Sequence, residues 1–301
     1  MRRFLKRQSC RWLPLAVTAL YSIAAAQDFD KVEIQTMQAG QGVFMLMGAG
    51  GNIGVCAGDD GVFLIDDQFA PLNGKIKAAV TELGDKPIKF VVNTHWHGDH
   101  TGGNELLGKA GAIIVAHENV RKLLSAEQFV EFFNSKVGPY PETALPMVTF
   151  TDSVTFHFNN EEISVFHVEA SHTDGDAVIY FKKANVMHTG DLLFSDGYPF
   201  IDVAHGGSVD GMIRATGQLL KIIDDQTRLI PGHGPLSDKE GLNAFRQMLI
   251  VLRDKIKGQI DSGLTLDQII ASKPTADFDE SRTGAIPADG FVKILYDDLT
   301  R

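Results

Sequence analysis

The sequence predicts an α/β (α+β) protein in which two β-sheets pack face to face and helices cover their outer faces. Short β-branched and apolar runs separated by glycine turns are followed by helical patterns, and the same succession then occurs a second time. A sheet with an apolar face must bury it against another layer, so two such halves form a sandwich. The halves look like a degenerate repeat, and no Pro/Ser-rich linker divides them.

In the first half, glycine and Asp-Asp-Gly turns separate apolar runs that are typical of short strands. Strands are expected at 32–35, 43–47, 53–56 and 62–65. They are followed in order by a helix at 73–83, a strand at 88–93, and helical segments that dominate between 104 and 135, interrupted by a strand at 112–115. Pro139, Pro141 and Pro146 then indicate a loop.

The second half begins with another series of apolar, β-branched runs. Strands are expected at 154–158, 163–168, 177–181 and 185–187. A helix near 208–224, a short strand at 228–230 and a long helix from about 238 complete the chain's regular pattern. Ser237, followed by Glu240, offers the long helix a capping box at its N-terminus.

The N-terminus has the layout of a secretory signal. Five basic residues lie within the first eleven, and the apolar stretch 12–26 ends in three alanines. This stretch is shorter than the roughly 20 residues that a spanning helix needs, which favours a cleaved signal over an uncleaved membrane anchor. We therefore expect a signal at 1–26 and a single domain with C-terminal helices at 27–301, with the export route left open.

Charge and cysteine content narrow the class of protein further. The whole chain has a formal charge of −10, and removal of the five basic signal residues leaves 23 basic against 38 acidic residues, or −15. No basic patch that would bind nucleic acid remains. Cys10 leaves with the signal, so Cys56 has no disulfide partner and is expected to be a buried, inert thiol. A signal without disulfides fits the bacterial periplasm.

Residues 94–103, Thr-His-Trp-His-Gly-Asp-His-Thr-Gly-Gly, concentrate ligand-type side chains directly after the strand at 88–93. Imidazoles and a carboxylate at a strand end are the usual material of a metal site. Three later loops or strand ends each place one such side chain among small or turn-forming residues. These side chains are His172, Asp191 and His233.

In residue type, spacing and order these motifs resemble the metallo-β-lactamase superfamily. Its His-x-His-x-Asp-His signature is matched by His95, His97, Asp99 and His100, and the three later ligand motifs follow in order over nearly all of the mature chain. The resemblance implies a four-layer αββα sandwich with two metals at the sheet edge. It implies a first zinc held by His95, His97 and His172, and a second held by Asp99, His100 and His233. Asp191 would bridge both, which makes Asp99 and Asp191 the carboxylates of the catalytic centre.

Other candidate residues receive structural interpretations. Gly48 to Gly54 hints at a nucleotide loop, but a strand rather than a helix follows it, so a hairpin loop bordering the active site is expected. One of Asp66 and Asp67 could bond to a ligand histidine, and His117 could do so less readily. We expect packing or surface roles for the remaining histidines, His157, His167, His188 and His205.

The predicted function is a dinuclear zinc hydrolase that attacks a carbonyl ester, thioester, lactone or lactam with a metal-bridging hydroxide. Its substrate would be a small molecule, and no stable membrane insertion is expected after signal cleavage. Export to the periplasm or medium favours a β-lactamase, but secreted β-lactamases of the superfamily usually carry Cys or Ser where this chain has Asp191. Two further alternatives are a mononuclear iron persulfide dioxygenase and a non-enzymatic metal-binding accessory protein.

Overall fold

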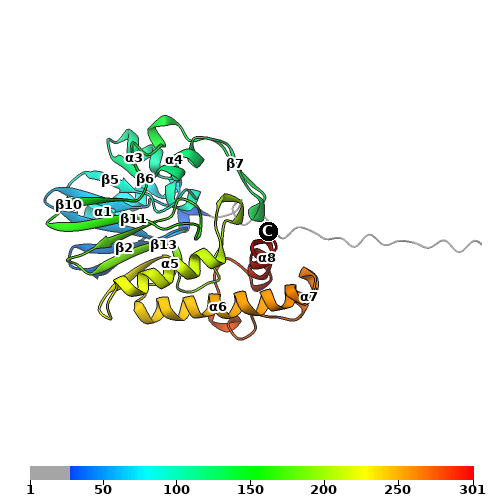
Figure 1. The fold of residues 1–301 in the computed structure, drawn as a ribbon. Coiled ribbons are helices and arrows are strands. Elements are labelled where there is room, and N and C mark those ends of the chain that lie inside the picture. Colours follow the sequence, from blue (N-terminus) through cyan, green and yellow to red (C-terminus); the bar gives the residue numbers. More distant parts are fainter. Residues whose placement is uncertain (1–27) are drawn as a thin grey trace, which may run out of the picture.

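The computed structural model describes residues 28–301, so the predicted signal and its cleavage site lie outside the described residues. Two sheets pack face to face, and helices cover the outer face of each (Figure 1). The predicted αββα sandwich is confirmed. Within the described part of the chain, no helix is both long enough and apolar enough to cross a bilayer.

The first sheet has seven strands in the order β1-β2-β3-β4-β5-β6-β9. Its first four strands form an antiparallel meander, and β4, β5, β6 and β9 then run parallel. The strands are β1 (Gln35–Gly40), β2 (Val43–Met47), β3 (Ile53–Gly58), β4 (Gly61–Ile65), β5 (Ile88–Val92), β6 (Ile113–His117) and β9 (Val148–Phe150). The helices of this half are α1 (Asn73–Leu83), α2 (Gly98–Thr101), α3 (Asn104–Lys109) and α4 (Glu118–Leu124).

The second sheet has five strands, antiparallel except that β14 runs parallel to β13. They are β10 (Ser153–Phe158), β11 (Glu161–His167), β12 (Ala177–Phe181), β13 (Val186–Phe194) and β14 (Arg228–His233). The helices of this half are α5 (Val209–Ile222), α6 (Lys239–Asp261), α7 (Leu266–Ala271) and α8 (Ala288–Leu299). Short 3-10 turns are η1 (Phe29–Lys31), η2 (Ala70–Leu72), η3 (Glu131–Phe133), η4 (Glu142–Ala144), η5 (Val203–His205) and η6 (Asp279–Ser281).

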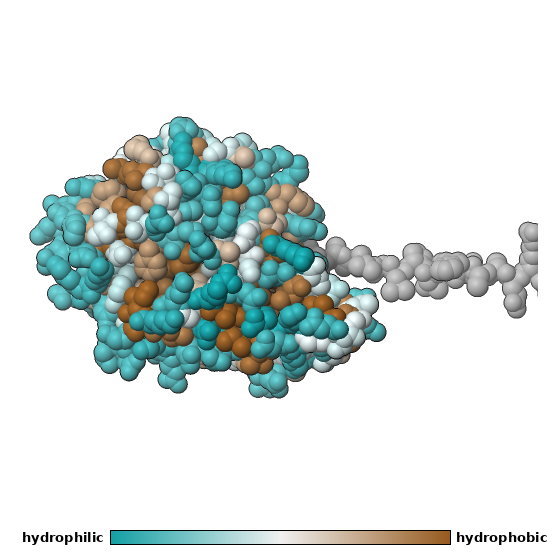
Figure 2. All heavy atoms as spheres, in the orientation of Figure 1, coloured by the Kyte–Doolittle hydropathy of each residue, from teal (hydrophilic) through white to brown (hydrophobic). Residues whose placement is uncertain are grey.

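Successive side chains along a strand point to opposite faces of its sheet, so each strand contributes to two layers of the core. Phe63 and Ile65 of β4 face the space between the sheets, whereas Val62 and Leu64 pack toward the α1 side. Between the sheets, Phe63 meets Phe156 edge-on, with ring centroids 5.0 Å apart. A buried strand of this kind reads as a continuous apolar run because both of its faces are covered. The face of the molecule shown in Figure 2 is mostly hydrophilic, with scattered apolar patches.

The prediction for residues 32–35 is wrong, because β1 begins only at Gln35. Lys75 of α1 donates hydrogen bonds to the backbone carbonyls of Phe29, Asp30 and Val32. These carbonyls are therefore satisfied by a side chain rather than by a neighbouring strand.

The helical prediction also fails between 128 and 135. There β7 (Gln128–Val130) and β8 (Ser135–Val137) form a hairpin, and Asn134 turns the chain with φ of 48°. Asparagine tolerates this left-handed conformation better than most residues. The short strand β9 was not predicted, and β13 extends well beyond 185–187, through Asp191.

The N-terminus of α6 is capped by Asp238 and not by Ser237. The Asp238 side chain accepts the backbone N–H of Gly241 at 2.9 Å. Ser237 instead pairs its backbone with Leu229, which fixes it outside the helix.

This capping assignment gives a matched pair of variants. Asp238→Ala should lower the free energy of unfolding by about 1 kcal/mol, because it removes the acceptor for an otherwise unpaired helix N–H. Ser237→Ala should change it by less than about 0.5 kcal/mol, as for other surface substitutions. Urea denaturation monitored by circular dichroism measures both. Equal losses, or a larger loss in Ser237→Ala, would contradict the assignment.

Candidate metal centre

The candidate site lies where the ends of strands from both sheets meet. The segment after β5 provides His95 and His97 and then α2 with Asp99 and His100, whereas the β11–β12 loop provides His172. Asp191 lies within β13, just after an irregularity at Gly190, and His233 ends β14. Each functional side chain thus sits at a strand end or distortion, where the backbone is free to turn it toward a common centre.

The structure brings all seven predicted residues together. His95, His97, His172 and Asp191 form one group and Asp99, His100 and His233 another, with the potential ligand atoms of each group within 4.8 Å of one another. Asp191 reaches both groups. Its Oδ2 lies 3.4 Å from Nε2 of His172 and 3.4 Å from Nε2 of His233.

The donor atoms face one another in a way that suits a cation. Nδ1 of His97 lies 3.0 Å from Nε2 of His95 and 2.9 Å from Nε2 of His172, and Nε2 of His100 lies 3.4 Å from Nε2 of His233. The buried Oδ1 of Asp191 has no hydrogen-bond partner. Converging imidazole nitrogens and an unsatisfied carboxylate oxygen are a ligand set, and a buried arrangement of this kind is costly without positive charge.

The outer nitrogens of the same rings are held by the protein. Nδ1 of His172 donates to the carbonyl of Phe200 at 2.7 Å, and Nε2 of His97 contacts Asp202 at 2.9 Å. Nδ1 of His100 contacts Asp66 at 2.8 Å. A proton fixed on the outer nitrogen leaves the lone pair of the inner nitrogen directed at the centre.

Burial and charge set the protonation of the cluster. Burial lowers the pKa of His172 to about 4 and holds the pKa of His95 well below its usual range, so both rings are neutral at pH 7. Burial favours the neutral form of Asp191, but His233 and His100 outweigh it and hold the pKa of the carboxyl well below its usual range. The carboxylate in turn raises the pKa of His100 and His233 against the effect of burial.

Glycines allow the surrounding backbone to approach the cluster. A Cβ on Gly51 would lie 2.1 Å from Cε1 of His100, and one on Gly232 would lie 1.9 Å from Oδ1 of Asp191. Gly51 belongs to the loop between β2 and β3. The glycine-rich stretch is therefore a hairpin loop that borders the site, as predicted, and not a nucleotide loop.

Asp66 and Asp202 contact ligand histidines, and only Asp66 was among the candidates that the sequence offered. Asp66 accepts from both the backbone and hydroxyl of Thr94 and contacts His100, whereas Asp67 accepts from the backbone of Gly103. Asp202 was missed. It is buried and contacts both His97 and His205. The one sign of it in the sequence is a carboxylate inside the apolar run 198–203, and this does not indicate which residue the carboxylate contacts.

The remaining histidines keep structural roles. His188 contacts the carbonyl of Asn52, and His157 is exposed on β10. His205 contacts Asp202 and so supports the site indirectly, which its predicted packing role did not include.

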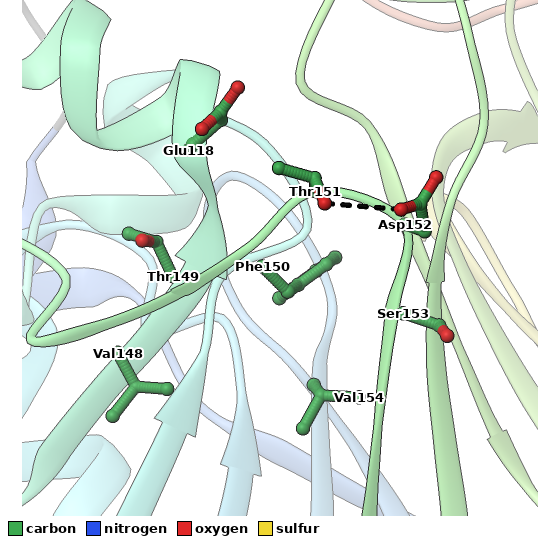
Figure 3. A pocket seen from close by; sticks show the side chains of 8 residues that line it. All are labelled: Glu118, Val148, Thr149, Phe150, Thr151, Asp152, Ser153 and Val154. Atoms are coloured by element: carbon green, nitrogen blue, oxygen red, sulfur yellow. Dashed lines mark hydrogen bonds between the residues drawn. The ribbon is translucent and has the colours of Figure 1, made fainter.

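His117 has no contact with the ligand group. It caps α4 and stacks on His167 with ring centroids 3.9 Å apart, so the alternative in which it supports a ligand is wrong. The next residue, Glu118, lines a surface hollow of about 490 Å³ together with residues 148–154 (Figure 3). None of the seven predicted ligands lines this hollow.

Comparisons with known proteins agree with this geometry. The family model described as the metallo-beta-lactamase superfamily matches residues 47–233. A hydroxyacylglutathione hydrolase from Pelagibacter ubique is 27% identical over 186 residues, which cover 59% of this chain and 68% of that relative.

Two solved structures share the fold. One is the inverting sec-alkylsulfatase Pisa1 from Pseudomonas sp., with a TM-score of 0.67, 18% identity and 88% of this chain covered. This chain spans only 50% of that structure. The other is a metallo-beta-lactamase from Pontibacter korlensis, with a TM-score of 0.58, 21% identity, and coverage of 71% of this chain and 99% of that one.

The neighbouring pair Asp66 and Asp67 tests the supporting contacts. Asp66→Asn should weaken the binding of a divalent metal ion by about 10- to 100-fold, because one amide oxygen cannot accept from both Thr94 and His100. Asp67→Asn should leave affinity nearly unchanged, because burial already raises the pKa of Asp67 well above its usual range and an amide oxygen can still accept from Gly103. Competition with a chromophoric chelator measures the metal affinity of both variants. Equal weakening in the two would show that the contact between Asp66 and His100 does not determine the affinity.

Proposed function

This chain belongs to the metallo-β-lactamase superfamily, and we propose that it is a dinuclear zinc hydrolase that cleaves a carbonyl ester, thioester, lactone or lactam. The observation that carries the proposal is the complete donor set, in which the buried Asp191 faces both groups of ligands. A binding protein that had lost catalysis would have no need to keep both groups and a shared carboxylate. Imidazole nitrogen and carboxylate oxygen are ligands that zinc accepts.

In this proposal His95, His97 and His172 would hold one zinc and Asp99, His100 and His233 would hold the other, with Asp191 available to both. When bound, a zinc pair supplies Lewis acidity and a water acidic enough to act as nucleophile near neutral pH. The protein's part is to fix the ligands. Phe200, Asp202 and Asp66 orient the rings through their outer nitrogens, and the β2–β3 loop packs against the ring of His100 at Gly51.

Asp191 favours esters, thioesters and lactones over β-lactams. Secreted β-lactamases of the superfamily usually carry Cys or Ser at this position, and Leu192, Leu193 and Phe194 follow where those enzymes present polar residues that anchor the substrate carboxylate. A further support is similarity to a relative named for hydrolysis of hydroxyacylglutathione.

We also propose that the protein acts in the periplasm or outside the cell. The support is the basic and apolar layout of residues 1–26. Cell fractionation with N-terminal sequencing of the mature protein tests this, and a full-length chain in the cytoplasmic fraction would contradict it.

Metal content and a substrate panel test the function directly. We expect close to two zincs per purified chain, loss of activity with a chelator and recovery with Zn²⁺. A panel of a thioester, a lactone, an aryl ester, a cephalosporin and an alkyl sulfate should show the highest kcat/KM on one of the first three.

Each failure of that experiment has a distinct meaning. One iron per chain would favour the persulfide dioxygenase, and full metal loading without turnover of any substrate would favour an accessory metal-binding protein. Turnover confined to the cephalosporin would show that Asp191 does not decide against β-lactams, and turnover confined to the alkyl sulfate would contradict carbonyl chemistry.

Asp191→Ser tests the shared carboxylate. The variant should retain one tightly bound zinc, because three histidines remain in the first group, and should bind the second at least about 10- to 100-fold more weakly. Turnover should fall by at least as much. Zinc stoichiometry measured against free Zn²⁺ gives the two affinities, with Asp67→Asn as the control for loss of a buried carboxylate elsewhere. Identical zinc curves for wild type and Asp191→Ser would show that Asp191 is not a ligand.

A further inference from the structure

The β7–β8 hairpin, which the sequence did not predict, lies beside the metal centre. Figure 1 shows it reaching from α4 toward α8. Tyr140, which follows the hairpin, lies with its hydroxyl 3.1 Å from that of Thr101, the neighbour of His100. On the opposite side, Phe132 packs close to Gly290 of α8. Phe132 therefore packs the turn of the hairpin against α8, and Tyr140 ties the segment that follows the hairpin to α2.

A continuous row of aromatic rings runs from the ligands to the turn of this hairpin. The ring of Phe200 lies 5.6 Å from that of His97 and 6.0 Å from that of His172, measured between centroids. Phe133 continues the row, with its ring centroid 4.9 Å from that of Phe200. Phe200 is buried, with 8% of its surface exposed, whereas Phe133 is 47% exposed. An exposed aromatic side chain at the end of such a row leaves apolar surface open beside the metal centre.

The charged side chains that contact the ligands do not indicate that the surface around Phe133 binds an anionic group. Among residues 28–301, no lysine or arginine forms an ion pair or side-chain hydrogen bond with any of the seven ligands. A negatively charged substrate group would therefore find no cationic side chain bonded to the cluster. An uncharged apolar group would instead find the exposed ring of Phe133, with the buried ring of Phe200 packed behind it.

We propose that the exposed ring of Phe133, backed by the buried ring of Phe200, forms a subsite for an aryl or bulky alkyl group next to the scissile carbonyl, and that Phe133 determines specificity for that group. This inference rests on the proposed hydrolase function and narrows its substrate class to esters and thioesters of apolar acids. Aromatic contacts of this kind discriminate by area and shape rather than by charge.

The hairpin provides a matched control. Phe129 lies on β7 of the same hairpin and is 46% exposed, but its ring makes no contact with the aromatic row. We would measure kcat/KM for the S-acetyl and S-phenylacetyl thioesters of N-acetylcysteamine. The preference for phenylacetyl should fall about three- to tenfold in Phe133→Ala, remain unchanged in Phe129→Ala, and recover in part in Phe133→Leu. An equal preference in Phe133→Ala and wild type would overturn the proposal.

Binding without turnover separates this inference from the proposed function. The zinc-loaded protein would be titrated calorimetrically with 3-mercaptopropanoate and with 2-benzyl-3-mercaptopropanoate, which differ only in the benzyl group. The benzyl compound should bind more tightly to wild type and Phe129→Ala, and its advantage should shrink about three- to tenfold in Phe133→Ala. A benzyl advantage that depends on Phe133 would support the subsite even if no thioester were hydrolysed. The lack of hydrolysis would contradict the proposed hydrolase function alone. A benzyl advantage that Phe133→Ala leaves intact would overturn the subsite.

Discussion

The buried carboxylate of Asp191 is the constraint around which the site is organised. It lies among four imidazoles, and one of its oxygens has no hydrogen-bond partner. A buried charge of this kind is costly unless positive charge offsets it. The backbone around it is correspondingly tight, since even a Cβ on Gly232 would collide with the carboxylate. The cluster is thus built for cations rather than for packing alone.

The two sheets divide the ligands between them. The segment after β5 in the first sheet carries His95, His97, Asp99 and His100, whereas His172, Asp191 and His233 come from the second. The face-to-face packing around Phe63 therefore decides whether the donor atoms meet. Because neither sheet alone holds a complete set, metal binding and association of the two halves stabilise each other.

The metal centre and the substrate surface depend on different parts of the chain. The ligands lie in or near the ends of strands of the two sheets, whereas the β7–β8 hairpin and the loop carrying Phe200 lie in the connections between those strands. In the proposed hydrolase, the ligands would supply reactivity and these connecting segments would supply selectivity. The similarity to a hydroxyacylglutathione hydrolase, an alkylsulfatase and a β-lactamase is consistent with one scaffold that carries several specificities.

The sequence alone determined the layered fold, the bounds of α1 and the seven residues that converge, because these depend on periodicity and on side chains placed next to strand ends. Only the tertiary structure decided the partners of the ligands. Asp202 reaches His97 across 105 positions, and the carbonyl of Phe200 reaches His172 across 28. The hairpin is likewise a tertiary product, since its three-residue strands are too short for local propensity to specify, while its turn packs against α8 and the segment after it contacts α2. Distant pairs leave no local pattern, and they form only when the chain folds.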